Sequence, residues 1–90
     1  MRFEWDARKA HANLRKHGVS FDEAISVFDD PLGITYSDPD HSNDEQRFVT
    51  FGHSSSKRLL VVSHTERGDT VRMIHARVAA RNERKIYEEG

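Results

Sequence analysis

The chain has 90 residues, of which 36% are hydrophobic and 32% charged, and this length suits one domain rather than two separate hydrophobic cores. It contains no cysteine, which excludes disulfides and thiolate metal sites, and no apolar run near the roughly 20 residues that a membrane helix needs. Because the N-terminus has no apolar signal region, we expect a cytoplasmic protein with a single domain over residues 1–90.

The net charge of -1 hides an uneven distribution along the chain. Residues 1–17 and residues 57–90 each carry a net charge of +3, whereas residues 18–45 carry -8. Two basic ends are suited to a nucleic acid or an acidic protein as a partner. The alternative is that the ends and the acidic middle neutralise each other within the fold.

The first third of the chain predicts one short strand and two helices. Residues 3–5 are aromatic and alternating, as is typical of a strand, and Gly18 is placed to end the helix that follows. The second helix begins at Ser20, which forms the pattern of a capping box with Glu23, and it ends at Pro31.

Four more strands and a last helix are predicted downstream. The expected strands cover residues 32–36, 46–51, 59–66 and 70–77, and the helix covers residues 78–89. A polar, turn-rich loop runs to Asp44 between the first two of these strands. The predicted fold is therefore α+β, with the element order β-α-α-β-β-β-β-α.

The last two strands form a predicted hairpin, in which Gly68 supplies the positive φ of a tight turn. The hairpin carries unusually many polar residues for a core element, and its register decides which of them meet. A loop of two residues would place His75 and Arg77 on the same face as His64, whereas a loop of three would place them beside Ser63. The sequence leaves both registers open.

Several stretches together carry a resemblance that covers essentially the whole chain. They read FEWD at 3–6, KHGVSFDEA at 16–24, VFDDP at 27–31, EQRF at 45–48, VSHTERG at 62–68, IHAR at 74–77 and ER at 83–84, followed by Tyr87. In these stretches the chain resembles the BrnT toxins, the ribonuclease half of bacterial type II toxin–antitoxin pairs. One position departs from the pattern, because the resemblance leads us to expect a small residue, usually serine, where this chain has His75.

The resemblance implies a RelE-like fold, in which a small, mostly antiparallel sheet is packed by two N-terminal helices and followed by a C-terminal helix. It also implies a metal-independent endoribonuclease that cleaves RNA and so inhibits translation. The implied partner is a BrnA-like antitoxin that neutralises the toxin in a heterotetramer of two toxins and two antitoxins. Contact with DNA would be indirect, through the antitoxin.

RNA cleavage without a metal uses the neighbouring 2′-hydroxyl as nucleophile, and it needs a base, an acid and cations around the phosphate. Arginine suits the phosphate because its fork matches two oxygens. The candidate catalytic residues are His64, Arg67, Arg72 and Arg77. The candidate RNA-binding residues are Lys16, His17, Arg47, His75, Arg81, Arg84 and Tyr87. The histidine spacings match no zinc pattern, so we expect no metal and no cofactor.

Each candidate also has a structural interpretation. Arg77 could form a salt bridge, His64 could be a satisfied histidine of the sheet, and Arg67 could be a solvated turn residue. Lys16 and His17 end the first predicted helix, where cations also favour the helix dipole.

Two rival functions remain open. The first is a non-catalytic interaction module that docks an acidic partner, as the weakly amphipathic last helix and the segregated charge suggest. The second is direct DNA binding through a turn between two helices, but Asp22, Glu23 and Asp29 on the second helix would repel phosphate.

Overall fold

A sheet of five strands is the framework of the computed structural model, which describes residues 1–41 and 45–90. The strands are β1 (Arg2–Glu4), β2 (Ile34–Asp38), β3 (Arg47–His53), β4 (Leu59–Arg67) and β5 (Thr70–Val78). Their order in the sheet is β1-β5-β4-β3-β2, with β1 parallel to β5 and every other pair antiparallel. The sheet is therefore mostly antiparallel, as predicted.

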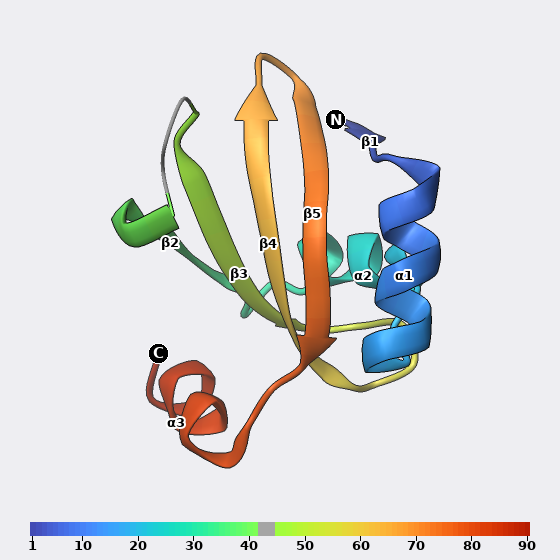
Figure 1. The fold of residues 1–90 in the computed structure, drawn as a ribbon. Coiled ribbons are helices and arrows are strands. Elements are labelled where there is room, and N and C mark those ends of the chain that lie inside the picture. Colours follow the sequence, from blue (N-terminus) through green and yellow to red (C-terminus); the bar gives the residue numbers. More distant parts are fainter. Residues whose placement is uncertain (42–44) are drawn as a thin grey trace.

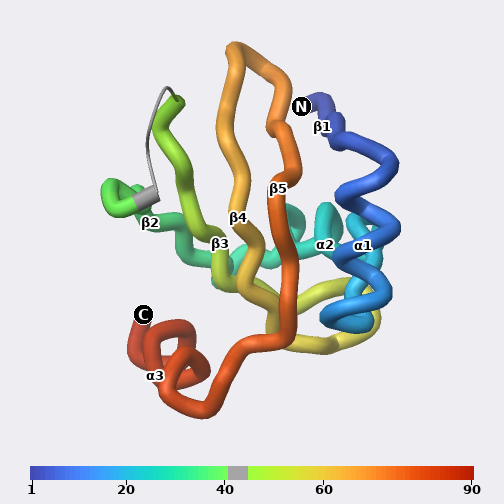
Figure 2. Tube along the Cα trace, viewed as in Figure 1, coloured from blue at the N-terminus to red at the C-terminus, as the bar shows by residue number. Residues whose placement is uncertain are grey.

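Helices α1 (Ala7–His17) and α2 (Phe21–Ile25) cover one face of the sheet, and α3 (Arg81–Glu89) lies beyond the end of β5 (Figure 1). A 3₁₀ turn at Ser26–Asp29 continues α2, and a second one occupies Pro39–His41. The N-terminus lies beside the β4–β5 turn, whereas the C-terminus lies near the opposite end of the sheet (Figure 2). The predicted α+β class and element order are confirmed.

The hydrophobic core fills the space between the sheet and the first two helices. Its fully buried members include Leu60 and Val62 of β4 and Met73 of β5, which meet Phe21 and Val27 from the helical layer. Because side chains alternate along a strand, burying these residues turns their neighbours to the opposite face of the sheet. That opposite face carries no helix of the N-terminal layer, and we call it the open face.

Local signals explain how the first helix is bounded. The Asp6 carboxylate accepts hydrogen bonds from the backbone N–H groups of Arg8 and Lys9, at 2.8 and 3.2 Å, which caps α1. The helix ends at Gly18, whose φ of 69° is in the left-handed region and whose N–H donates to Leu14.

Of the two hydrogen bonds in the predicted capping box of the second helix, the structure contains one. Ser20 Oγ accepts a hydrogen bond from the Glu23 N–H at 3.0 Å, as expected. The Glu23 carboxylate instead accepts from Ser54 Oγ at 2.6 Å and pairs with Arg58, which together tie α2 to the β3–β4 turn. The charged Arg58 is a stronger donor than a backbone amide, which explains the choice.

Several element boundaries differ from the prediction, by two or three residues at β2, at the end of β3 and at the start of α3. β2 begins at Ile34 rather than at residue 32, because Gly33 N–H donates to Asp30 and closes a turn there. α3 begins at Arg81 rather than at residue 78, because β5 continues to Val78. The end of the predicted loop, residues 42–44, lies outside the described residues. Within the described ranges, no helix is long and apolar enough to cross a membrane.

Candidate active site on the open face of the sheet

An irregularity in β5 turns His75 and Arg77 to the open face. Near the turn, His64 pairs with Met73, which is the register of the two-residue loop. Past the turn the register shifts by one residue, so that Ser63 pairs with His75. Such a β-bulge reverses the face of every later side chain. The loop therefore has two residues, yet His75 lies beside Ser63 rather than on the face of His64.

The shifted register aligns two rows of side chains across the open face. One row consists of Tyr36, Val49, Ser63 and His75, and the next consists of Ile34, Phe51, Val61 and Arg77. Neighbouring strands lie about 4.8 Å apart, so each row spans about 14 Å from β2 to β5. Each row thus begins with an apolar or aromatic side chain on β2 and ends with a basic one on β5.

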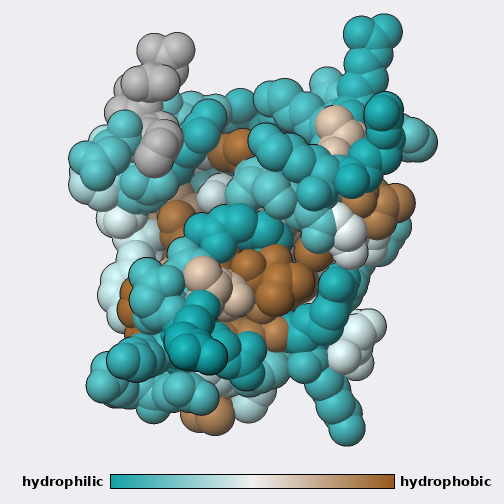
Figure 3. Space-filling model, turned by 60° about the horizontal axis from the view of Figure 1, so that its bottom comes forward, coloured by the Kyte–Doolittle hydropathy of each residue, from teal (hydrophilic) through white to brown (hydrophobic). Residues whose placement is uncertain are grey.

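The open face is hollowed into a groove of about 730 Å³. Its lining residues are Tyr36, Ser37, Asp38, Arg47, Val49, Phe51, Val61, Ser63, Ile74, His75, Arg77 and Glu83. Apolar surface is exposed near the centre of the view in Figure 3, and polar side chains surround it. The lining combines apolar side chains with charged ones, which is common in ligand sites.

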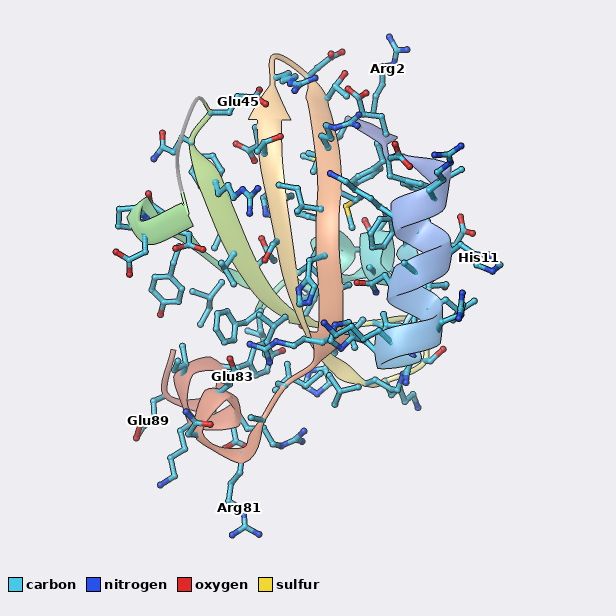
Figure 4. The ribbon with its side chains drawn as sticks, in the orientation of Figure 1. Arg2, His11, Glu45, Arg81, Glu83 and Glu89 are labelled. Atoms are coloured by element: carbon cyan, nitrogen blue, oxygen red, sulfur yellow. The ribbon has the colours of Figure 1, made fainter. Side chains whose placement is uncertain are left out.

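Arg77 lies in the groove with its guanidinium already engaged. Its two terminal nitrogens donate to the two carboxylate oxygens of Glu83 at 2.6 and 2.7 Å. Glu83 lies on the side of α3 that faces the sheet, whereas Arg81 points away from it (Figure 4). The hydrogen bonds from Arg77 lower the pKa of the Glu83 carboxyl. The Arg77 guanidinium thus binds a carboxylate through two parallel hydrogen bonds, and a phosphate would be bound in the same geometry.

His75 contacts His17 at the C-terminal end of α1. The two Nε2 atoms are 3.0 Å apart and the rings are nearly perpendicular, at 83°. One of these nitrogens must accept the hydrogen bond and therefore carries no proton. Partial burial lowers the pKa of His75, and the nearby charges of His17, Arg77 and Lys16 lower it further. His75 is consequently neutral near pH 7 and able to accept a proton.

Asn13 fixes the strand between His75 and Arg77. Its Nδ2 donates to the carbonyl oxygens of Ala76 and Val19 at 2.8 and 2.9 Å, and its Oδ1 accepts from the Ala76 N–H at 3.1 Å. β1 pairs with β5 only at Thr70–Arg72, so the side-chain amide replaces the missing strand partner further along. Sequence reasoning did not single out this residue.

His64 lies on the opposite face from the groove. Its side chain is fully buried, Nε2 is 2.7 Å from Thr50 Oγ1, and its ring packs against Phe28 and Phe48. Burial lowers the pKa of His64 to about 4. Its buried Nδ1 has no hydrogen-bond partner among the described residues, so the histidine is only partly satisfied. Its burial on the core face separates it from the groove.

The buried His64 should make folding sensitive to mild acid. Its pKa is near 6.5 when unfolded and about 4 when folded, so the unfolded state takes up the proton first. The associated stability is present above the unfolded pKa and is lost as the pH falls from about 6.5 to 4. We expect urea denaturation to show a loss of about 2 kcal/mol between pH 7 and pH 5. His64→Gln keeps a group that can bond to Thr50 but cannot titrate, so its profile should be flatter; an equally steep profile would exclude His64 as the cause.

The structure places Arg67 and Arg72 near the β4–β5 turn, outside the residues that line the groove. Arg67 forms a bidentate pair with Glu45, with both distances 2.6 Å, and Arg72 Nη1 lies 3.0 Å from the Glu4 carboxylate. The pair of Arg67 with Glu45 joins a basic end to the acidic middle, as one of the two alternatives for the charge pattern expected. The pair of Arg72 with Glu4 instead joins the two basic ends.

The candidates on α3 are not brought into the groove either. Arg81 and Arg84 are exposed. The Tyr87 hydroxyl donates to Asp30 at 2.7 Å, and its ring meets the edge of His53 with centroids 4.9 Å apart. Burial and the bond to Asp30 raise the pKa of Tyr87 to about 12. Tyr87 thus anchors α3, and of the predicted residues only Arg47, His75 and Arg77 line the groove.

In the described ranges, no three histidine, aspartate or glutamate side chains gather as a metal site would require.

Comparison with known proteins identifies the family. The model of the ribonuclease toxin BrnT of type II toxin–antitoxin systems matches residues 5–83. The chain belongs to the BrnT family. Among solved structures, it is similar to the crystal structure of the Brucella abortus ribonuclease toxin BrnT, with a TM-score of 0.65 and 20% identity, over 90% of this chain and 99% of that one. No curated protein matches the sequence.

Membership of the BrnT family confirms the resemblance carried by the sequence motifs. It makes the chain a member of a ribonuclease toxin family of type II toxin–antitoxin systems, and it implies an antitoxin as a partner. Nine of the twelve residues that line the groove were not among the candidates, and five of these nine are polar: Tyr36, Ser37, Asp38, Ser63 and Glu83. For Tyr36 and Ser63 the available signal was the alternation of side chains along β2 and β4, which could be used only once the register was known; Glu83 belongs to the ER motif at 83–84 but was not singled out.

Proposed function

We propose that this BrnT-family protein is a metal-independent endoribonuclease whose active site is the groove on the open face. The observation that carries the proposal is the bidentate anion site of Arg77, placed beside a neutral His75. A cation fork and a proton acceptor next to each other are what cleavage by a 2′-hydroxyl requires.

In the proposed reaction the 2′-hydroxyl attacks the adjacent phosphorus while His75 Nε2 or its hydrogen-bonded partner His17 removes the proton. The bond to the 5′-oxygen of the next nucleotide breaks, and that oxygen takes up a proton from the protonated imidazole or from water, which leaves a 2′,3′-cyclic phosphate and a 5′-hydroxyl. Arg77 balances the charge that builds on the phosphate oxygens. The phosphate takes the place of the Glu83 carboxylate in the Arg77 fork, so substrate binding releases this contact of α3.

Other basic residues are proposed to contact the RNA outside this centre. Arg47 lines the same groove, and Lys16 is close enough to His75 to lower its pKa. Arg81 and Arg84 are exposed on α3 and can reach the backbone of a longer strand. His64, Arg67 and Arg72 are left out of the proposed centre, because they lie on the other face or at the far turn.

The proposed partner is a BrnA-like antitoxin, in a heterotetramer of two toxins and two antitoxins that contacts DNA through the antitoxin. Its expected action is to prevent inhibition of translation by the toxin. The family assignment supports this part of the proposal, since the antitoxin is the second component of a type II system.

The test is cleavage of RNA by the purified protein in EDTA. We expect cleavage to proceed at the same rate with and without the chelator, and to yield 2′,3′-cyclic phosphate ends. A single 2′-deoxy nucleotide at the mapped cleavage position is the matched control, because it removes the nucleophile and should block cleavage there. Loss of activity in EDTA with recovery on adding a divalent ion would contradict the proposed chemistry. No cleavage under any condition would favour the non-catalytic interaction module.

A further inference from the structure

We propose that Tyr36, Val49 and Phe51 form a subsite that stacks a nucleobase of single-stranded RNA. This subsite occupies the β2–β3 end of the groove, away from Arg77. The inference rests on the proposed ribonuclease function and adds to it the part of the substrate that is recognised. It assigns a role to Tyr36 that neither the motifs nor the family gives.

The position of Tyr36 suits a stacking platform. Its side chain is 45% exposed on the edge strand β2, in the same row as His75. The ring stands at 90° to that of Phe51, with centroids 6.0 Å apart, and Phe51 is itself buried. A rigid core residue therefore supports one side of the tyrosine while its remaining surface faces the groove. Large exposed aromatic rings of this kind are typical of sites that bind unpaired bases.

The two ends of the groove suit two kinds of group in an RNA strand, a phosphate and the base of a nearby nucleotide. The β5 end offers the Arg77 fork and His75 to a phosphate, and the β2–β3 end offers Tyr36, Val49 and Phe51 to a flat apolar ring. The rows connect these ends over about 14 Å. The volume of about 730 Å³ falls within the roughly 300–1,000 Å³ typical of ligand pockets.

The charged side chains of the groove offset each other, so a stacking contact would add to RNA binding. Arg47 and Arg77 line it together with Asp38 and Glu83, so two cations are offset by two carboxylates. General attraction to phosphate is accordingly weaker than the arginines alone would suggest. Stacking does not depend on charge, and it is available only where the bases are not already stacked in a duplex. The groove should therefore select single strands.

The experiment measures RNA affinity by fluorescence anisotropy. The probe is a short, labelled single-stranded RNA in which every 2′-hydroxyl is methylated, so that it binds without being cleaved. Tyr36→Ala should raise the Kd about 5- to 100-fold, the range expected for one lost base–aromatic contact. Tyr36→Phe keeps the ring and should stay within about twofold of wild type. Leu32→Ala is the matched control, because Leu32 is 70% exposed but does not line the groove.

The outcomes separate this inference from the proposed function. If the wild type cleaves RNA but Tyr36→Ala binds the probe as tightly, the stacking subsite is overturned and the ribonuclease remains. If the wild type neither binds nor cleaves RNA, the proposed function fails first. If Tyr36→Ala loses affinity for the antitoxin but keeps it for RNA, the surface serves a protein partner and the inference is wrong. An unchanged Tm for Tyr36→Ala, together with near wild-type RNA binding by Tyr36→Phe, would show that the loss of affinity is not caused by misfolding.

Discussion

Arg77→Ala is expected to reduce RNA cleavage by at least about 10³-fold, the lower range found for arginines that stabilise phosphoryl transfer. The guanidinium lies in the groove and holds a carboxylate with two parallel hydrogen bonds. Arg77→Lys keeps the charge but loses the fork, so it should recover only a small part of the rate. The measurement is kcat/KM on a single-stranded RNA with a mapped cleavage position.

A second variant separates phosphate binding from a structural role of Arg77. Arg77→Ala also breaks the contact with Glu83, and that contact is one of the few that hold α3 to the sheet. Glu83→Gln weakens the same contact but leaves Arg77 in place. We expect Glu83→Gln to keep or raise activity, because the phosphate no longer competes with a carboxylate for the fork. An equal loss in both variants would show that Arg77 acts only as an anchor for α3.

The thermal stability of Arg77→Ala and Glu83→Gln should change little, whatever happens to their activity. The pair is partly exposed, with Arg77 and Glu83 side chains 36% and 18% accessible, and such pairs contribute at most about 1 kcal/mol. Tm values close to that of the wild type for both variants are therefore the expected control. The contrast between a large catalytic effect and a small thermodynamic one is what assigns Arg77 to the reaction.

The elements of the fold could be predicted because their signals are local. Gly18 ends α1 in the left-handed conformation, and Gly68, with a φ of 62°, forms the two-residue turn of the hairpin. Each signal depends only on the backbone of a few neighbouring residues. The start of α3 depends instead on the pairing of β5 with β4, which carries the strand to Val78. The start of β2 depends on the turn in which the Gly33 N–H donates to Asp30, and this turn was not predicted.

The site could be predicted only in part, because its geometry depends on the bulge in β5. The motifs singled out His64, His75 and Arg77, but their relative placement changes with a shift of one residue. No residue type near Ile74 marks the bulge, since the irregularity is a property of how β4 and β5 pair. The same limit applies to Tyr36, whose position opposite Val49 follows from the register of β2 and β3.

The second large effect is expected at Asn13, a residue with no chemistry of its own in the reaction. Asn13→Ala leaves the Ala76 N–H, the Ala76 carbonyl and the Val19 carbonyl without their partner. Asn13 is only 6% exposed, and each buried group left unsatisfied costs about 1–3 kcal/mol. We expect urea denaturation to show a loss of at least about 3 kcal/mol, although alanine is the better helix former.

The loss at Asn13 should also reach the active site, because Ala76 lies between His75 and Arg77. Asn13 and His17 are four residues apart on one face of α1, so one helix surface both clamps Ala76 and supports His75. Under conditions where Asn13→Ala remains folded, kcat should fall more than KM rises, since the reacting groups are displaced while the groove persists. His11→Ala is the matched control, because His11 lies on the same helix but points away from the sheet (Figure 4). If Asn13→Ala proved as stable and active as His11→Ala, the strand would be held without the amide, and the bulge alone would account for the geometry of the site.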